Sequence, residues 1–414
     1  MRQPTDLNPR SGPRILIYSH DTMGLGHLRR CRTIAHALVE RQKDLSVLII
    51  SGSPIIGSFD FKARVDFVRV PGVIKLRNGE YTSLNLHIDV AETLAIRGSI
   101  IRHTAEAFAP DLLLIDKEPL GLRGEVADTL SLLKSRGVPL VLGLRDVMDD
   151  PLLLEPEWKR KNVLPALRDL YDDIWIYGLP QICDPLAGIA LTRPIKRKIS
   201  YTGYLPRSLP TLPRPNLLDG FDGEPYLLVT TGGGGDGEAL IDWVLSAYEQ
   251  DAGLPHRAVL VLGPFMQSDR QTEFLQRAER LSNVRAITFD ARLEALIAGA
   301  AGVVAMGGYN TFCEILSFDK RALIVPRTEP RLEQFIRAQR AEELGLVRML
   351  GDDGRRDARR MAVALRQLPQ QPLPSETVVP GLLDGLENVD RLTTRWLSSG
   401  RRTLRAPRLA TARG

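Results

Sequence analysis

The stretch VVAMGGYNTFCEIL, residues 303–316, runs from a strand through a glycine turn into a helix. Its first residues form an unbroken apolar run, which is typical of a strand buried on both faces of a parallel sheet. Gly307 and Gly308 then clear the space before the helix, whose free N–H groups and dipole favour an anion such as phosphate. Thr311 and Glu314 also spell T-x-x-E, a capping box that needs no ligand. The residues alone leave the anion site and the cap as equal alternatives.

Strand-like apolar runs alternate with helical patterns on both sides of this stretch. They lie at 14–19, 46–52, 65–72, 111–116, 139–146 and 173–178, and again at 225–235, 257–265, 284–289, 302–308 and 321–327. Apolar strands separated by helices indicate parallel sheets that are covered on both faces. We therefore predict an α/β protein with two doubly wound, Rossmann-like domains that face each other across a cleft. Ligands of such sheets bind beyond the carboxyl ends of the strands.

Composition and length place the domain boundaries, since 414 residues suit two domains. We predict the following segments: a disordered N-terminus (1–13), an N-terminal domain (14–205), a proline-rich linker (206–222), a C-terminal domain (223–370), a C-terminal helical segment (371–400) and a basic tail (401–414).

The overall composition is that of a soluble globular protein, with 43% hydrophobic and 25% charged residues and a formal net charge of +5. Cys31, Cys183 and Cys313 are scattered, which argues against a disulfide framework and a zinc site. The N-terminus lacks the apolar core of a signal peptide. We therefore expect a cytoplasmic protein and no nucleic-acid partner. Peripheral contact with a membrane stays open because the tail is basic.

A glycine-rich loop, TTGGGGDGEAL at 230–240, joins a strand to a helix in the second half. Gly232, Gly234 and Gly237 match the dinucleotide fingerprint G-x-G-x-x-G. That fingerprint expects an acid at the end of the next strand, which here reads LVLGPF and carries none. The missing acid argues against an NAD site. A cradle for a diphosphate remains, beside the alternative of a turn without a ligand.

A second loop, DTMGLGHLRR at 21–30, occupies the corresponding place in the first half. Gly24 and Gly26 allow a tight turn, Arg29 replaces the third fingerprint glycine, and His27 lies where the helix begins. A histidine with a near-neutral pKa could accept a proton from a substrate hydroxyl. The alternative is that His27 only caps the helix or binds a loop carbonyl.

A third element begins a helix just past the last strand of the second half, in EPRLEQFIRAQRAEELG at 329–345. Glu333 and Gln334 stand at its start. A carboxylate beside a cleared helix N-terminus suits a pair of ribose hydroxyls.

Together these motifs resemble the nucleotide-sugar domain of GT-B glycosyltransferases, and most of all family 28, which includes the peptidoglycan N-acetylglucosaminyltransferase. GLGH, residues 24–27, resembles the acceptor-side loop of that family. The resemblance implies an inverting glycosyltransferase that moves a sugar from a nucleoside-diphosphate donor, first of all a UDP-sugar, to a hydroxyl acceptor. The acceptor would be a saccharide or a lipid-linked molecule. No cofactor and no metal are expected.

The resemblance also implies roles by position. The donor diphosphate would be held by Gly233, Gly234, Gly235, Gly307, Gly308, Asn310 and Thr311. The base would lie beside Phe289 and Asp290, the ribose on Glu314, and the donor sugar on Glu333 and Gln334. The acceptor-side loop would contribute Gly24, Gly26 and Arg29, and the general base would be His27, with Asp21 as second candidate.

Two positions depart from the family pattern. Met306 stands where many members carry a charged phosphate contact, so Arg327 or Arg331 would have to replace it. Arg331 itself occupies the place of an aspartate in the peptidoglycan enzyme, which argues for another sugar and acceptor. The alternatives are a UDP-sugar 2-epimerase on the same fold, a non-catalytic nucleotide-sugar-binding protein and, third, an NAD-dependent enzyme.

Overall fold

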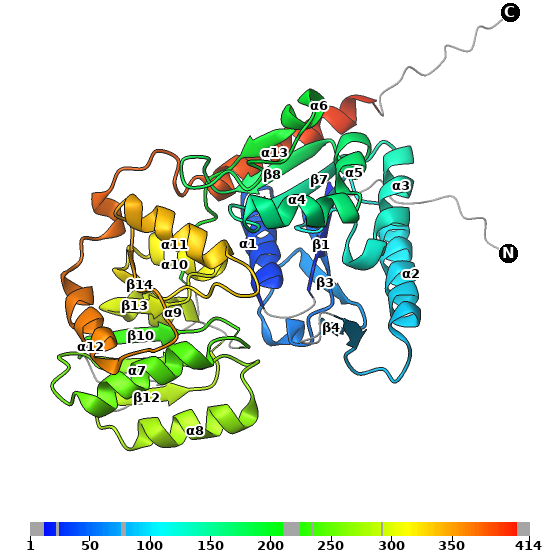
Figure 1. The fold of residues 1–414 in the computed structure, drawn as a ribbon. Coiled ribbons are helices and arrows are strands. Elements are labelled where there is room, and N and C mark those ends of the chain that lie inside the picture. The colour runs from blue at the N-terminus through cyan, green and yellow to red at the C-terminus, as the bar shows by residue number, and fades with distance from the viewer. Residues whose placement is uncertain are drawn as a thin grey trace, which may run out of the picture.

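The computed structural model describes residues 12–21, 25–75, 80–209, 224–233, 235–290 and 293–403. Gly24 and Gly234 lie outside the described residues, as do most of the predicted N-terminus, linker and tail. The chain folds into two α/β units, each built on a parallel sheet with helices on both faces (Figure 1). The predicted fold class is confirmed.

The first sheet has seven strands in the order β3-β2-β1-β6-β7-β8-β9. Its strands are β1 (Arg14–Ser19), β2 (Ser46–Ser51), β3 (Val65–Arg69), β6 (Leu112–Asp116), β7 (Leu140–Arg145), β8 (Asp173–Tyr177) and β9 (Ile199–Tyr201). The helices of this unit are α1 (Gly26–Arg41), α2 (Val90–Phe108), α3 (Ala127–Ser135), α4 (Pro151–Arg160), α5 (Val163–Asp169) and α6 (Arg193–Lys196). A small antiparallel pair, β4 (Val73–Lys75) and β5 (Tyr81–Ser83), stands apart from the sheet.

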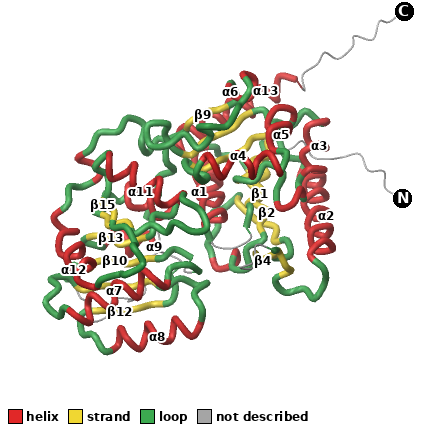
Figure 2. The backbone as a smooth tube through the Cα atoms, in the orientation of Figure 1, coloured by secondary structure: helices red, strands yellow, loops and turns green. Residues whose placement is uncertain are grey.

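The second sheet has six strands in the order β12-β11-β10-β13-β14-β15. Its strands are β10 (Tyr226–Thr230), β11 (Arg257–Val261), β12 (Val284–Ile287), β13 (Gly302–Ala305), β14 (Ala322–Ile324) and β15 (Arg348–Met349). Its helices are α7 (Glu238–Gln250), α8 (Ser268–Glu279), α9 (Leu293–Gly299), α10 (Tyr309–Ser317), α11 (Glu333–Glu343) and α12 (Ala358–Gln367). Figure 2 shows the two groups of strands, each flanked by helices.

The central strands of both sheets were predicted because their side chains are apolar on both faces. Every residue of β6, β8 and β10 is buried, as parallel strands between two helical layers require. The short edge strands β9 and β15 were not predicted, because Ile199–Tyr201 and Arg348–Met349 are only partly buried and form no apolar run.

The last helix, α13 (Gly385–Thr403), returns to the first unit and packs near α1 and β8 (Figure 1). Asn388 Nδ2 donates a hydrogen bond to the Thr202 carbonyl at 2.8 Å, and an Arg395 N–H pairs with Asp173 at 2.7 Å. The helix extends to Thr403, so the first residues of the predicted basic tail are helical. The last described helix thus packs on the unit that contains the first described strand.

A single apolar cluster continues from the first sheet into the second. Tyr204, at the end of the first unit, lies 5.1 Å from the Phe312 ring and 5.9 Å from the Tyr309 ring, measured between centroids. All three side chains are buried. This packing joins helix α10 of the second unit to the first unit and positions the cavity between them.

Candidate active site

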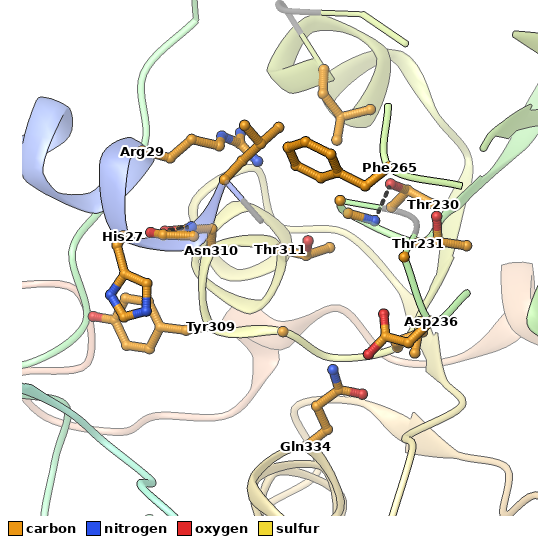
Figure 3. A pocket seen from close by; sticks show the side chains of 18 of the residues that line it. His27, Arg29, Thr230, Thr231, Asp236, Phe265, Tyr309, Asn310, Thr311 and Gln334 are labelled. Carbon is orange, nitrogen blue, oxygen red and sulfur yellow. Dashed lines mark hydrogen bonds between the residues drawn. The ribbon is translucent and has the colours of Figure 1, made fainter. Parts of the chain in front are cut away.

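A cavity of about 450 Å³ lies between the two units, at the carboxyl ends of their central strands. The start of α1, the loop after β10 and the start of α10 form its walls (Figure 3). The predicted site residues that line it are Gly26, His27, Arg29, Gly233, Gly235, Phe289, Asp290, Gly308, Asn310, Thr311 and Gln334. Four predicted residues lie outside its lining: Asp21, Gly307, Glu314 and Glu333.

Helix α10 opens onto the cavity with an uncapped N-terminus. It begins at Tyr309 after Gly308, and no side chain caps it, so the capping box considered for Thr311 and Glu314 is wrong. Its first N–H groups are therefore free for a ligand. A Cβ on Gly308 would meet nothing within 4 Å, whereas Gly307 has φ +78° and lies against Ile324. Gly307 makes the turn, and Gly308 keeps the helix start open.

The loop after β10 forms the second glycine-lined wall. Gly232 has φ +67°, and its N–H donates to Thr230 Oγ1 at 3.2 Å. A Cβ on Gly237 would come within 2.2 Å of Thr231 Cβ, so only glycine lets α7 pack this closely on the strand. Gly232, Gly233 and Gly235 of this loop line the cavity.

Arg327 supplies a positive charge at the donor side of the cavity. Its Nε lies 2.6 Å from Asp236 Oδ2, and an N–H lies 3.2 Å from Glu333 Oε1. Burial raises the pKa of Glu333, but Arg145 and other arginines outweigh it and lower this pKa to about 2. Of the two arginines considered in place of a charged residue at Met306, Arg327 lines the cavity.

Arg331 is directed away from the donor side. It pairs with Asp149 at 3.2 Å and with Glu157 at 2.8 Å, both in the first unit. Gln334 lines the cavity, and its side-chain oxygen accepts a hydrogen bond from the backbone N–H of Arg327 at 3.1 Å.

Glu314 is fully buried beneath Arg29, which crosses from the first unit. Arg29 pairs with Glu314 and, at 2.8 Å, with Glu294. Glu314 Oε2 has no hydrogen-bond partner, and burial raises the pKa of Glu314 to about 7 against the opposing charge of Arg29. Arg29, which was predicted to belong to the acceptor-side loop, therefore covers Glu314, which was predicted to bind the ribose.

His27, the second residue of α1, lies at the cavity and is backed by Asp116 at the end of β6. His27 Nδ1 is 2.5 Å from Asp116 Oδ2. Arg30 holds the same carboxylate through Nε at 2.8 Å and an N–H at 2.7 Å. Although burial opposes it, the charges of Arg30 and His27 lower the pKa of Asp116. Arg30 also lies 3.0 Å from Nδ1, but the Asp116 carboxylate is closer, at 2.5 Å. Because a carboxylate only accepts, we assign the ring proton to Nδ1, which leaves Nε2 to act as a base.

Sequence reasoning did not identify Asp116. The signal was its position at the end of the apolar run 111–116, where the carboxyl end of a central strand meets the cleft. The partnership with His27 spans 89 positions of sequence and needed the structure.

Asp21 does not reach the cavity. It is 3% exposed, accepts a hydrogen bond from the Ser51 hydroxyl at 2.6 Å and another from the Leu28 N–H at 3.1 Å. Both contacts tie it to the start of α1 and the end of β2. The geometry therefore leaves His27 as the base candidate at the cavity.

The described residues contain neither a group of side chains that could bind a metal ion nor a membrane-spanning helix. Among them, no three His, Cys, Asp or Glu side chains are grouped so as to hold a metal ion. None of the helices in the described ranges is both long and apolar enough to cross a bilayer.

Comparison with known proteins shows a family match for the second half and a shared fold for the whole chain. Residues 227–376 match the family model of the glycosyltransferase family 28 C-terminal domain. No curated protein matches the chain. Among solved structures, a UDP-glucosyltransferase from Polygonum tinctorium has a TM-score of 0.62 at 14% identity, covering 94% of this chain and 99% of that one.

Two further structures have the same fold. Phytolacca americana UGT2, complexed with UDP-2fluoro-glucose and pterostilbene, has a TM-score of 0.60 at 15% identity, covering 94% of this chain and 95% of that one. The calicheamicin glycosyltransferase CalG4 has a TM-score of 0.57 at 16% identity, covering 95% of this chain and all (100%) of that one. These matches confirm the GT-B fold and the resemblance of the second half to family 28.

Proposed function

We propose that the protein is an inverting glycosyltransferase that moves a sugar from a nucleoside-diphosphate donor, most directly a UDP-sugar, to a hydroxyl of a saccharide or lipid-linked acceptor. The observation that carries the proposal is that His27, which is paired with Asp116, lines the same cavity as the open start of α10 and the loop after β10. Figure 3 shows His27 beside Tyr309 and Asn310 at the start of α10. The family match of the second half and the UDP-sugar in a solved structure of the same fold support the donor class.

In this proposal the donor diphosphate rests on the second unit. The free N–H groups at the start of α10 and the charge of Arg327 would stabilise the negative charge that develops on the leaving diphosphate. Because these groups supply the positive charge, the proposal includes no metal and no organic cofactor. Gln334 would contact the donor sugar, and Phe289 with Asp290 would border the base.

The transfer itself would begin at His27. Neutral Nε2 takes the proton of the acceptor hydroxyl while its oxygen attacks the anomeric carbon, and the bonding electrons leave with the diphosphate. Asp116 fixes the ring and stabilises the imidazolium that forms. Since the base belongs to the first unit and the diphosphate site to the second, we expect attack from the side opposite the leaving group, which would invert the anomeric centre.

The donor assignment is tested by thermal shift with UDP-, GDP- and dTDP-sugars. A ligand at about 100 times its Kd stabilises the fold by about 2.7 kcal/mol, so the correct nucleotide is expected to raise Tm. Glu314→Gln is expected to weaken UDP binding about tenfold if the carboxylate binds the ribose hydroxyls. Glu343→Gln, at an exposed position of α11, serves as the matched control.

Two results would count against this assignment. If Glu314→Gln binds UDP as tightly as the parent protein, Glu314 does not bind the ribose. If the donor is converted to an epimer in the absence of any acceptor, the reaction is that of a 2-epimerase and not a transfer.

The pH dependence of transfer tests the role of His27. Burial lowers the pKa of His27 below its ordinary value of 6.5, even though Asp116 favours the charged form. A lowered pKa keeps the imidazole neutral, and therefore basic, to lower pH. We expect kcat/KM for the acceptor, which reports the pKa values of the free enzyme, to be constant through neutral pH and to fall only below pH 6.5. An acid limb centred above that value would contradict the assignment.

A further inference from the structure

Two basic side chains, Lys117 and Arg145, stand at the carboxyl ends of the neighbouring strands β6 and β7, on the wall that carries His27: Lys117 directly follows β6, and Arg145 is the last residue of β7. Asp116 pairs with Gly143 in the sheet, and the Lys117 N–H donates to the Gly143 carbonyl at 2.8 Å. Arg145 lines the cavity, whereas Lys117 lies behind the lining, next in sequence to Asp116, the partner of His27. Arg145 therefore borders the place where an acceptor hydroxyl has to meet His27, and Lys117 lies directly behind that place.

Lys117 has a backbone conformation that residues with a side chain rarely adopt. Its φ is +68°, in the left-handed region. Such conformations persist where the surrounding structure holds them, and they gather at functional sites. Here the turn directly follows Asp116, so one local geometry places both the partner of His27 and Lys117.

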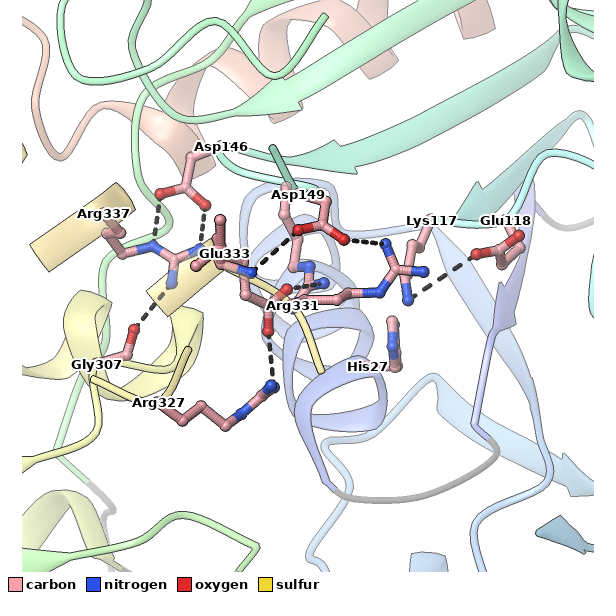
Figure 4. A network of polar contacts seen from close by, with 12 residues as sticks. His27, Lys117, Glu118, Asp146, Asp149, Gly307, Arg327, Arg331, Glu333 and Arg337 are labelled. Atoms are coloured by element: carbon pink, nitrogen blue, oxygen red, sulfur yellow. Dashed lines mark hydrogen bonds and ion pairs between the residues drawn. The ribbon is translucent and has the colours of Figure 1, made fainter. Parts of the chain in front are cut away.

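The charge of Lys117 is weakly balanced. Its Nζ lies 3.9 Å from Glu118 Oε1 (Figure 4). Lys161 binds Glu118 more closely, at 3.0 Å. Burial, followed by the charge of Arg145, lowers the pKa of Lys117 to about 8. Burial and the charge of Arg145 thus destabilise the charged form of Lys117 more than the Glu118 carboxylate stabilises it.

The positive charge of Arg145 is also only partly compensated by a carboxylate. It pairs with Glu333 at 2.5 Å, but Glu333 also serves Arg327 at 3.2 Å. Arg145 Nε is buried and has no hydrogen-bond partner. Burial lowers the pKa of Arg145 despite Glu333. One carboxylate is therefore shared between two guanidinium groups.

We infer that the acceptor carries an anionic group, a carboxylate or a phosphate, beside the hydroxyl that receives the sugar, and that Lys117 and Arg145 bind this group. The inference rests on the proposed function. A guanidinium donates two parallel N–H groups to such an oxyanion, and an ammonium adds a point charge. The anionic group would pair with two buried cations whose carboxylate partners also bind other basic side chains. It would thereby hold the acceptor hydroxyl next to His27.

The test uses the full chain saturated with UDP, so that anions are kept from the donor site. Acetate, inorganic phosphate and neutral glycerol are titrated separately, and the His27 ring signal is followed by NMR with labelled histidine; a His27→Ala spectrum assigns the signal. We expect saturable shifts with acetate or phosphate and none with glycerol. The anion with the lower Kd identifies the group, and a bound anion also raises the pKa of His27.

Three variants show which lysine is responsible. Lys117→Met is expected to weaken anion binding about tenfold or more, as the loss of a charge-assisted contact implies, and Lys117→Arg to retain it. Lys161→Met removes the other lysine that contacts Glu118, and it is expected to leave anion binding unchanged.

The outcomes separate the two proposals. If UDP binds and neither anion shifts the His27 signal, or if Lys117→Met binds anions as the parent does, the inference is overturned and the proposed function stands. If no nucleotide raises Tm, the proposed function itself fails.

Discussion

Replacing His27 by alanine is expected to lower kcat for sugar transfer by about 10²- to 10⁴-fold, the usual contribution of a positioned general base. The ring is the proton acceptor that the structure brings to the cavity, with Nδ1 held by Asp116 at 2.5 Å and Nε2 left free. Donor binding should change little, because the predicted nucleotide contacts lie on the second unit. The measurement is initial-rate transfer at saturating donor, together with the thermal shift by UDP.

Asp116→Asn should reproduce a large part of this loss. An asparagine amide can donate to Nδ1, which would move the ring proton to Nε2 and remove the free base. His103→Ala provides the matched control, since His103 is exposed on α2 and hydrogen-bonds only locally, to Ser99. A His27→Ala protein that transfers sugar at the parent rate would show that the base lies elsewhere.

The parts of the site that could be predicted are those that depend on residues close together in the sequence. Gly307 and Gly308 stand at the end of an apolar strand run, and His27 follows the loop after another such run, so their place at the cleft follows from the parallel α/β fold. For Thr311 and Glu314 the same local reasoning left a cap and a ligand site as equal alternatives, and the structure contradicts the cap. Their T-x-x-E spacing fits a cap, but the helix begins at Tyr309, two residues earlier.

The parts that could not be predicted depend on contacts between distant segments. Arg29 reaches Glu314 and Glu294 across the two units, and no local pattern indicates which carboxylate an arginine will meet. Arg145 and Lys117 sit at ordinary strand ends, and their importance appears only when β6, β7 and α1 are placed together. Similarly, α13 was predicted as a helix, but its return to the first unit was not.

Removing the carboxylate of Asp146 is expected to destabilise the protein more than any surface substitution. Asp146 follows β7 in the first unit and pairs with Arg337 of α11 through two contacts of 2.7 and 2.6 Å (Figure 4). The Tyr204 hydroxyl donates to the same carboxylate at 2.8 Å. The side chains of Asp146 and Arg337 are 0% and 1% exposed. Asp146→Ala would leave the guanidinium buried and unpaired, at a cost of about 3–5 kcal/mol in the free energy of unfolding.

The effect should also reach the donor site, because another N–H of Arg337 donates to the Gly307 carbonyl at 2.8 Å. Loss of Asp146 frees Arg337 to move, and with it the turn that opens helix α10. Urea unfolding gives the stability and UDP titration gives the donor affinity. Asp242→Ala, which breaks a partly exposed ion pair with Arg277, is the control and should cost less than about 1 kcal/mol.

A double variant identifies the cause. If the unpaired guanidinium is responsible, Asp146→Leu combined with Arg337→Met should be clearly more stable than Asp146→Ala alone, since both charges are gone. If instead Asp146→Ala lowers stability no more than Asp242→Ala does, the buried pair does not hold the two units together. The open start of α10 would then owe its position to the Tyr204, Tyr309 and Phe312 packing alone.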